Sequence, residues 1–194
     1  MSNIKFDEYL QEHINASIRL PENKITIDKI VEACILSLKN GGAIYLVGNG
    51  GSAADCQHME AELVVRFKQN RQPIPALALT SNMSVGTAVS NDFSYDEVFS
   101  RQVEAFGKQG DILFCLSTSG ESVSVIRAIE MAQNKGMKTI CITGKKENSV
   151  SRSCDISFQI ESNHTSIIQE QMLILEHFIC QELEDNLVSN GSYK

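Results

Sequence analysis

Five short runs of apolar residues, each bounded by turn residues, divide the middle of the chain. They are residues 43–47, 76–79, 112–116, 139–143 and 156–160, and helical stretches fill the gaps between them. Strands that are apolar throughout are typical of a parallel sheet that helices cover on both faces. The pattern therefore predicts an α/β fold with a doubly wound five-stranded parallel sheet flanked by helices, whose ligands bind beyond the carboxyl ends of the strands.

Helical periodicity precedes the first run. Apolar residues recur every four positions from Phe6 to Ile18, and a second apolar stripe extends from Ile27 to Leu38. The first helix is amphipathic and is expected to pack on a neighbouring element. With no linker or repeat to mark a second domain, we expect one domain over residues 1–194. It comprises N-terminal helices (1–40), a sheet core (43–160) and a C-terminal helix (165–188).

The C-terminal helix has an unusual middle. Residues 172–180 are apolar on nearly every face except at Glu176 and His177. A helix that is apolar all round is buried all round, and a chain of this size rarely encloses its last helix so fully. We therefore expect association between subunits, and we expect His177 to be a buried polar group that needs a partner.

Composition and charge narrow the possible functions. The chain has 194 residues, 42% of them hydrophobic, and a net charge of −7, which argues against binding nucleic acid or an anionic membrane surface. No apolar run approaches the roughly 18 to 20 residues that span a bilayer. Its six cysteines occur singly and no signal segment precedes them, so we expect free thiols in a reducing cytoplasm.

The loop of residues 117–122 combines four hydroxyl side chains with a glycine, between a predicted strand and a predicted helix. Hydroxyls and free backbone N–H groups then converge where the helix dipole favours negative charge. Serine and threonine also cap helices without binding anything. Four hydroxyls in six residues, at the end of a middle strand, favour a phosphate site.

An earlier loop, residues 48–52, has the sequence Gly-Asn-Gly-Gly-Ser. It contains no P-loop motif. It fits a loose dinucleotide fingerprint, but the acidic residue expected about 20 positions later is missing, so nicotinamide binding is improbable. The glycines are expected to let the backbone approach a smaller ligand, with Asn49 and Ser52 hydrogen-bonding it.

Three polar residues follow this loop on one predicted helical face: Asp55, His58 and Glu62. They could form a solvated ion pair, or His58 and Glu62 could form a metal-ligand or acid/base pair. The segment of residues 90–93, Ser-Asn-Asp-Phe, is interpreted as the cap of a following helix with core positions at residues 98, 99, 103 and 106.

Taken in order, these motifs resemble the phosphoheptose isomerase family of the SIS (sugar isomerase) superfamily. The likeness covers the chain from the first helix to about residue 187. It rests on Gly48-Asn49-Gly50-Gly51-Ser52, His58-x-x-x-Glu62, Ser90-Asn91-Asp92-Phe93, Ser117-Thr118-Ser119-Gly120-Glu121-Ser122, and Gln169 with His177. The sequence departs from the family pattern at Ser166, where an acidic residue is expected, and at Val65, where glycine is common.

The resemblance implies a homotetrameric enzyme that converts sedoheptulose 7-phosphate to D-glycero-D-manno-heptose 7-phosphate, for bacterial heptose precursors. Converting a ketose to an aldose through an enediol needs a base at carbon and an acid at oxygen. The resemblance gives these roles to Glu62 and His177. No organic cofactor is required.

The same resemblance assigns the remaining roles. The phosphate would be held by Ser117, Thr118, Ser119 and Ser122. The sugar would contact Asn49, Gly50, Gly51, Ser52, Glu62, Asn91, Asp92 and Gln169. In zinc-binding members the ligands would be His58, Glu62, Gln169 and His177, one ion per subunit. Because Gln169 and His177 lie about 12 Å apart along one helix, both must reach inward or different subunits must contribute.

A different class of function stays open from the sequence. Some SIS relatives bind sugar phosphates as regulators, or associate with the bacterial replication initiator, without known catalysis. We expect such proteins to lack the carboxylate at position 62 or the imidazole at position 177. This chain has both, which favours the isomerase.

Overall fold

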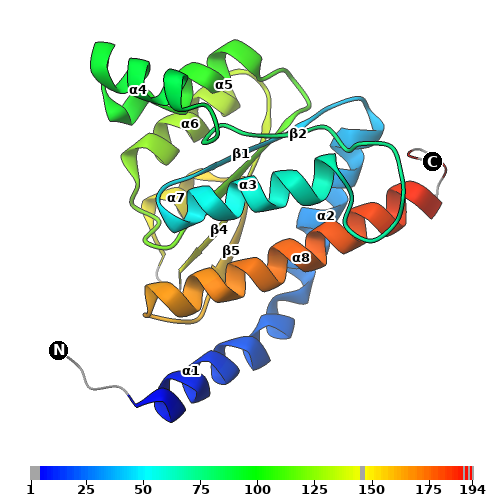
Figure 1. Ribbon diagram of the computed structural model, residues 1–194, viewed down its shortest axis with the longest axis vertical. Helices are drawn as coiled ribbons and strands as arrows, with labels where there is room; N and C mark the ends of the chain where they lie inside the picture. Colours follow the sequence, from blue (N-terminus) through cyan, green and yellow to red (C-terminus); the bar gives the residue numbers. More distant parts are fainter. Residues whose placement is uncertain (1–4, 145–146, 190, 192, 194) are drawn as a thin grey trace.

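The computed structural model describes residues 5–144, 147–189, 191 and 193, so residues 1–4 of the expected N-terminal region lie outside it. Its centre is a five-stranded parallel sheet in the order β2-β1-β3-β4-β5 (Figure 1). The strands are β1 (Ile44–Gly48), β2 (Ala76–Ala78), β3 (Ile112–Ser117), β4 (Lys138–Gly144) and β5 (Ile156–Ile160). The predicted doubly wound sheet is confirmed, with strand ends within a residue or two of the apolar runs. The chain reverses direction across the sheet between β1 and β3, which places the ligand crevice at their carboxyl ends.

One face of the sheet is covered by α2 (Lys24–Lys39), α3 (Gly51–Val64) and α8 (Thr165–Ser189). Their apolar stripes pack on strand residues such as Leu46 and Phe114, all fully buried. Helices α3 and α8 lie side by side and run in the same direction (Figure 1). This arrangement sets polar residues of the two helices opposite one another along their length.

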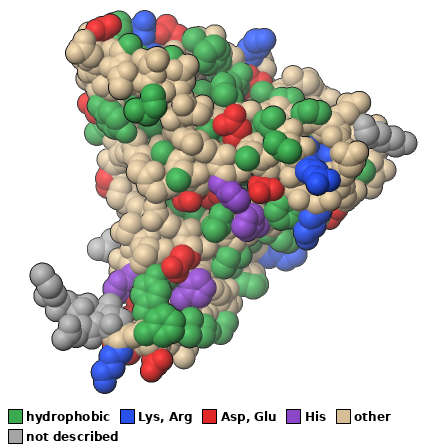
Figure 2. Space-filling view, viewed as in Figure 1, with side chains coloured by type: hydrophobic (Ala, Val, Ile, Leu, Met, Phe, Trp, Pro, Cys, Tyr) green, Lys and Arg blue, Asp and Glu red, His purple; other side chains and the backbone are tan. Residues whose placement is uncertain are grey.

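Helix α1 (Phe6–Arg19) joins this layer through a 3₁₀ turn, η1 (Leu20–Asn23). Polar side chains connect it to α8: Tyr9 donates to Glu170 over 2.7 Å, and the His13 ring lies 2.8 Å from the same carboxylate. Its apolar stripe faces outward instead, with Phe6 75% and Ile18 67% exposed, and hydrophobic side chains gather over α1 on the face shown in Figure 2. The contact between α1 and its own chain is therefore made largely by its polar side.

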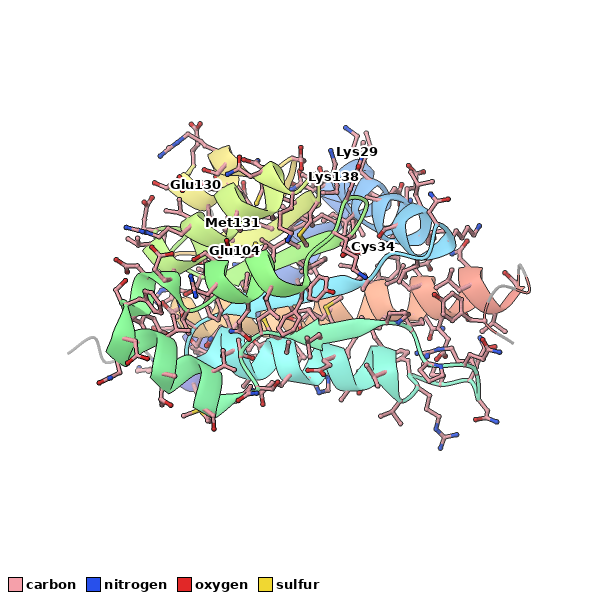
Figure 3. All side chains as sticks on the ribbon, turned by 90° about the horizontal axis from the view of Figure 1, so that it is seen from above. Lys29, Cys34, Glu104, Glu130, Met131 and Lys138 are labelled. Atoms are coloured by element: carbon pink, nitrogen blue, oxygen red, sulfur yellow. The ribbon has the colours of Figure 1, made fainter. Side chains whose placement is uncertain are left out.

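The opposite face of the sheet carries α5 (Ser100–Phe106), α6 (Val123–Asn134) and α7 (Ser149–Ser153). Glu104 of α5 and Met131 of α6 lie in this layer (Figure 3). Val98, Phe99 and Val103 are buried there as predicted, but Phe106 is 47% exposed, so its assignment to the core was wrong. Phe106 is the last residue of α5, just before the turn that leads to β3.

The interpretation of residues 90–93 as a helix cap is also wrong. Ser90, Asn91 and Asp92 form the last turn of α4 (Met83–Asp92), and Phe93 is its C-cap residue; a 3₁₀ turn, η2 (Tyr95–Glu97), follows. The N-cap residue of the following helix, α5, is Phe99. Helix α4 itself is capped by Asn82, whose side-chain oxygen accepts hydrogen bonds from the backbone N–H groups of residues 84 and 85. Helix α4 buries none of its residues, so it has no apolar stripe that would predict it.

The prediction that the cysteines are free thiols is confirmed for the part of the chain that the structure describes. All six cysteines are free thiols, and all except Cys154 are buried. Within the same residues, no helix is long and apolar enough to cross a membrane.

Candidate active site

The two small-residue loops follow the two strands that flank the reversal of strand order. The first links β1 to α3, and its Gly50 has a φ of +57°, a conformation that favours glycine. At Gly51 a Cβ would meet the end of the Gln169 side chain on α8, which would have to move aside. The loop thus turns tightly and lets α8 approach the start of α3. Ser52 is buried, with 3% of its surface exposed.

The second loop, between β3 and α6, folds partly on itself. Ser117 accepts a hydrogen bond from the backbone of Gly120 over 3.1 Å, and Ser119 accepts one from the backbone of Glu121 over 3.3 Å. Ser122 is the N-cap residue of α6, yet its side chain makes no capping hydrogen bond. The loop contains no lysine or arginine. Its hydroxyls and the start of α6 form a cradle of neutral donors, which suits an anion.

Asn49 joins the two loops. Its side-chain amide nitrogen donates to Ser122 over 2.6 Å and to Ser124 over 3.0 Å, while Tyr95 donates to its carbonyl oxygen over 2.6 Å. The sequence had singled out Asn49 and Ser122 but not Tyr95 or Ser124. The proximity of the two loops is what a ligand crevice at the strand ends requires.

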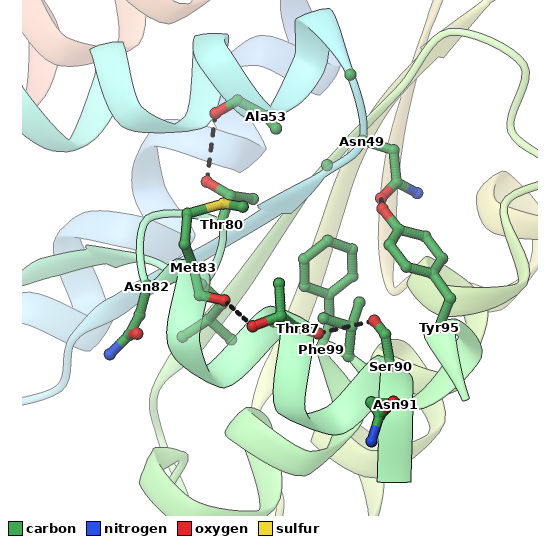
Figure 4. Close-up of a pocket in the computed structure, with 15 residues that line it drawn as sticks. Asn49, Ala53, Thr80, Asn82, Met83, Thr87, Ser90, Asn91, Tyr95 and Phe99 are labelled. Carbon is green, nitrogen blue, oxygen red and sulfur yellow. Dashed lines mark hydrogen bonds between the residues drawn. The ribbon is translucent and has the colours of Figure 1, made fainter. Parts of the chain in front are cut away.

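Two cavities adjoin these loops. One of about 570 Å³ is lined by Asn49, Gly50, Ser90 and Asn91 together with further residues of α4, η2 and the segment that follows β2 (Figure 4). The other, of about 440 Å³, is lined by Thr118 and Ser119 together with residues 144, 162, 163, 165 and 168. Asp92 lines neither; it accepts a hydrogen bond from Asn91 over 2.8 Å at the exposed end of α4.

Two histidines and a carboxylate meet where α3 passes α8. The Nε2 atoms of His58 and His177 lie 2.9 Å apart, and His58 Nε2 lies 3.8 Å from a Glu62 oxygen. Figure 2 shows histidine and acidic side chains gathered near the middle of this face. His58 and Glu62 are 41% and 24% exposed, so they can reach a ligand. The structure thus brings together both residues of the predicted acid/base pair.

The fourth candidate metal ligand lies elsewhere. Gln169 packs against Gly51, about 12 Å along α8 from His177. Imidazole, carboxylate and amide oxygen are donors that zinc accepts. Among the described residues, however, no group of three or more His, Cys, Asp or Glu is arranged to hold a metal ion. The four residues of one chain have suitable chemistry but do not converge on one point.

In the apolar middle of α8, residues 172–180, the buried polar group is Glu176 and not His177. Glu176 is 0% exposed, and neither of its oxygens has a hydrogen-bond partner in the described part of the chain. Burial, with a smaller contribution from the charge of Asp55 on α3, raises the pKa of Glu176 to about 8. His177 is partly exposed instead and has His58 as its partner. The expectation of a buried His177 was therefore wrong by one position.

A buried ion pair fixes the far ends of α3 and α8. Glu184 on α8 and Arg71 in the loop after α3 are both fully buried, with Nε and carboxylate 2.9 Å apart. Arg71 also donates to the backbone carbonyl groups of Leu63 and Glu62, over 2.8 and 2.9 Å. The pair therefore holds the helix turn that carries Glu62 against the helix that carries His177. Pattern analysis found neither Arg71 nor Glu184.

The fold and the hydroxyl loop together define an SIS-domain protein, and residues 8–144 match the family model of the SIS domain. The relatives are more specific. A phosphoheptose isomerase from Aliarcobacter butzleri is 46% identical over 161 residues, which cover 83% of this chain and 85% of that protein. The chain therefore belongs to the phosphoheptose isomerase family.

Solved structures agree with this assignment. A phosphoheptose isomerase from Neisseria gonorrhoeae is 34% identical, with a TM-score of 0.86 over 91% of this chain and 95% of that one. Another from Francisella tularensis is 31% identical, with a TM-score of 0.90 over 95% of this chain and 100% of that one. The resemblance noted in the sequence is confirmed.

Proposed function

We propose that the protein isomerises sedoheptulose 7-phosphate to D-glycero-D-manno-heptose 7-phosphate. The observation that carries the proposal is the meeting of Glu62 and His177 beside His58 on two helices that begin near the cradle. A sugar-phosphate-binding protein without catalysis would need the cradle but not this cluster. Family membership favours the same reaction, and the product would serve bacterial heptose precursors.

In the proposed chemistry, the Glu62 carboxylate removes the proton from the carbon next to the carbonyl group, exchanges it with solvent, and delivers a proton to the former carbonyl carbon. His177 exchanges a proton with the sugar oxygens, so that an enediol forms and collapses. The contact between His58 and His177 orients the second ring, because one ring nitrogen must donate while the other accepts. The phosphate, held at a distance from the reacting carbons, contributes binding energy that positions them.

We propose that the enzyme works as a homotetramer. Two surfaces support association: the outward apolar stripe of α1, and Ile174 and Phe178 on α8, which are 41% and 44% exposed in the single chain. The spacing of the site supports it as well. Glu62 lies about 16 Å along α3 from Gly51, so a partner subunit could bring the cradle and the acid/base pair closer together than one chain does.

We also propose that His58, Glu62, Gln169 and His177 are the ligands of a zinc ion. The donor types support it, and residues from more than one subunit would complete the set that one chain leaves spread along α8. When bound, zinc would polarise the sugar carbonyl group. Metal analysis of the purified protein tests this proposal. About one zinc per subunit is expected in the native protein and a lower zinc content in His58→Asn, and an active enzyme without metal would refute the proposal.

We propose a cytoplasmic location as well, which the free thiols support.

The central experiment is incubation of the pure protein with sedoheptulose 7-phosphate in deuterated solvent, followed by NMR. We expect the aldose to form and the transferred hydrogen to exchange with solvent. Glu62→Gln keeps the volume of the side chain but removes its basic oxygen, so kcat should fall by roughly 10²- to 10⁴-fold. Glu60→Gln, on the same helix, is the matched control. No turnover by the native protein, or native exchange by Glu62→Gln, would contradict the assignment.

A further inference from the structure

Three hydrogen bonds connect Tyr95 on η2 to the hydroxyl cradle through Asn49. The Tyr95 hydroxyl donates to Asn49 Oδ1 over 2.6 Å, and the Asn49 amide nitrogen donates to Ser122 Oγ over 2.6 Å and to Ser124 Oγ over 3.0 Å. Figure 4 shows the Tyr95 hydroxyl directed at Asn49 on the wall of the larger cavity. The four residues come from three separate segments of the fold, so the connection exists only in the folded protein.

The direction of each bond matters because a side-chain amide has a donor end and an acceptor end. A tyrosine hydroxyl that donates its hydrogen fixes the carbonyl oxygen of Asn49 toward itself. Both N–H groups of Asn49 then face the serines. If the amide were turned over, its carbonyl oxygen would face Ser122 and would compete for the hydrogen of that hydroxyl.

The state of Ser122 determines what the cradle can offer an anion. A serine hydroxyl has one hydrogen and two acceptor positions. Because Asn49 donates to Ser122 and so occupies an acceptor position, this contact does not use the hydroxyl hydrogen of Ser122, which stays available for a ligand. An anion requires donors, and the loop has no cationic side chain that could compensate for a lost one.

We propose that Tyr95 is a positioning residue for phosphate binding: it fixes the amide of Asn49 so that Ser122 presents its hydroxyl hydrogen to the phosphate of the substrate. Tyr95 itself touches neither the phosphate nor the reacting carbons. The inference rests on the proposed function, since it takes the cradle as the phosphate site. It also gives Asn49 a second role, because its amide hydrogens are directed to serines and not to the sugar.

The test replaces Tyr95 with phenylalanine, which removes the hydroxyl and keeps the ring. We expect the Kd for inorganic phosphate, measured calorimetrically, and the KM for sedoheptulose 7-phosphate to rise by about three- to tenfold, the value of one neutral hydrogen bond. The kcat should stay within about twofold. Tyr45→Phe is the matched control, because the Tyr45 hydroxyl donates to the backbone of Phe106 away from the cradle, over 3.1 Å. It should change none of these values.

A double-variant cycle separates positioning from general loosening of the loops. In a Ser122→Ala background the Tyr95→Phe substitution should have no further effect on phosphate binding, because its target is gone. Asn49→Asp, which cannot donate to Ser122, should weaken phosphate binding more strongly and should likewise lose most of that effect beside Ser122→Ala. These variants keep the inference testable should Tyr95→Phe lower the Tm.

Three outcomes would overturn the inference: unchanged phosphate binding in Tyr95→Phe, an equal loss with and without Ser122, or a fall in kcat at constant KM. Phosphate titration does not depend on turnover. If Tyr95→Phe weakens phosphate binding but the native protein does not isomerise the sugar, only the proposed function is refuted. If the native protein is active and the Kd for phosphate is the same in Tyr95→Phe, only this inference is refuted.

Discussion

Replacing Glu184 with glutamine should destabilise the protein more than any other substitution of similar size on α8. The carboxylate accepts from the backbone N–H groups of residues 67, 68 and 69, over 2.9, 2.8 and 2.7 Å, and from Arg71 over 2.9 Å. Each carboxylate oxygen accepts two of these bonds. Whichever oxygen becomes an NH₂ group, two donors lose their acceptor and Arg71 loses its counter-charge.

The expected cost follows from this geometry. Removing one partner of a buried ion pair costs about 3 to 5 kcal/mol, because the remaining charge stays buried. A chain of this size loses about 2 to 4 °C of Tm per kcal/mol, so Tm should fall by roughly 6 to 20 °C. Since Arg71 also binds the backbone carbonyl of Glu62, kcat should decrease even where the variant is folded.

The pH dependence gives a second signature. Burial alone would raise the pKa of Glu184, but the backbone N–H groups of residues 67–69 and Arg71 together hold it below its ordinary value. The stabilisation is therefore complete above the pKa of the unfolded chain and is lost as pH falls through the lower pKa of the folded protein. Glu184→Gln should lack this part of the acid-induced loss of stability.

Urea unfolding followed by circular dichroism measures both effects. Asp185→Asn is the matched control: Asp185 is on the same turn of α8, is exposed and accepts from the side chain of Gln69, so its loss should cost within about 0.5 kcal/mol. A Glu184→Gln protein that loses less than about 1 kcal/mol, at an unchanged m-value, would refute the reasoning.

Three further predictions concern other parts of the molecule. Ser119→Ala should raise KM more than it lowers kcat, and the dephosphorylated sugar should be a very poor substrate, because the cradle lies away from the reacting carbons; equal turnover of both sugars would contradict this. Glu176 binds its proton more tightly in the folded chain, with a pKa of about 8 against 4.5, so stability should fall as pH rises between these values. Glu176→Gln should therefore be more stable than the native protein at pH 8, by roughly 4 kcal/mol; an unchanged or lower stability in urea would argue against it. Leu10→Glu with Ile14→Glu should reduce the mass measured by light scattering from four chains towards one, since both lie on the outward stripe of α1; a persistent tetramer would place the interface elsewhere.

The sequence predicted the sheet well because its central strands, β1, β3 and β4, are buried along nearly their whole length and are therefore continuous apolar runs. It missed α4 because that helix is exposed, contains Gly86 and has no apolar stripe. The error of taking His177 in place of Glu176 as the buried residue has a related cause. Where both flanks of a helix are apolar, periodicity does not determine which of two adjacent residues faces the core.

The loops of the candidate site could be predicted from the sequence, but the supporting residues Tyr95 and Arg71 could not. Each loop is a contiguous motif at a strand end, which a reader of the sequence can find. Tyr95 acts on a residue 46 positions away, and Arg71 on one 113 positions away. Such pairs leave no local pattern, since only the fold brings the partners together. The contact between His58 and His177 also depends on how α3 and α8 lie side by side.

The proposed cradle would hold its ligand with dipoles, since the hydroxyl loop carries no positive side chain of its own, in a chain whose net charge is −7. Dissolved salt screens the attraction between separated charges, but it affects hydrogen bonds at contact distance much less. Such a cradle cannot draw anions in from a distance, and it selects them by shape once they arrive. Its affinity for phosphate should therefore vary little between dilute and concentrated salt, whereas the affinity of a lysine- or arginine-based site would change. The difference matters in a cell whose internal ionic strength changes.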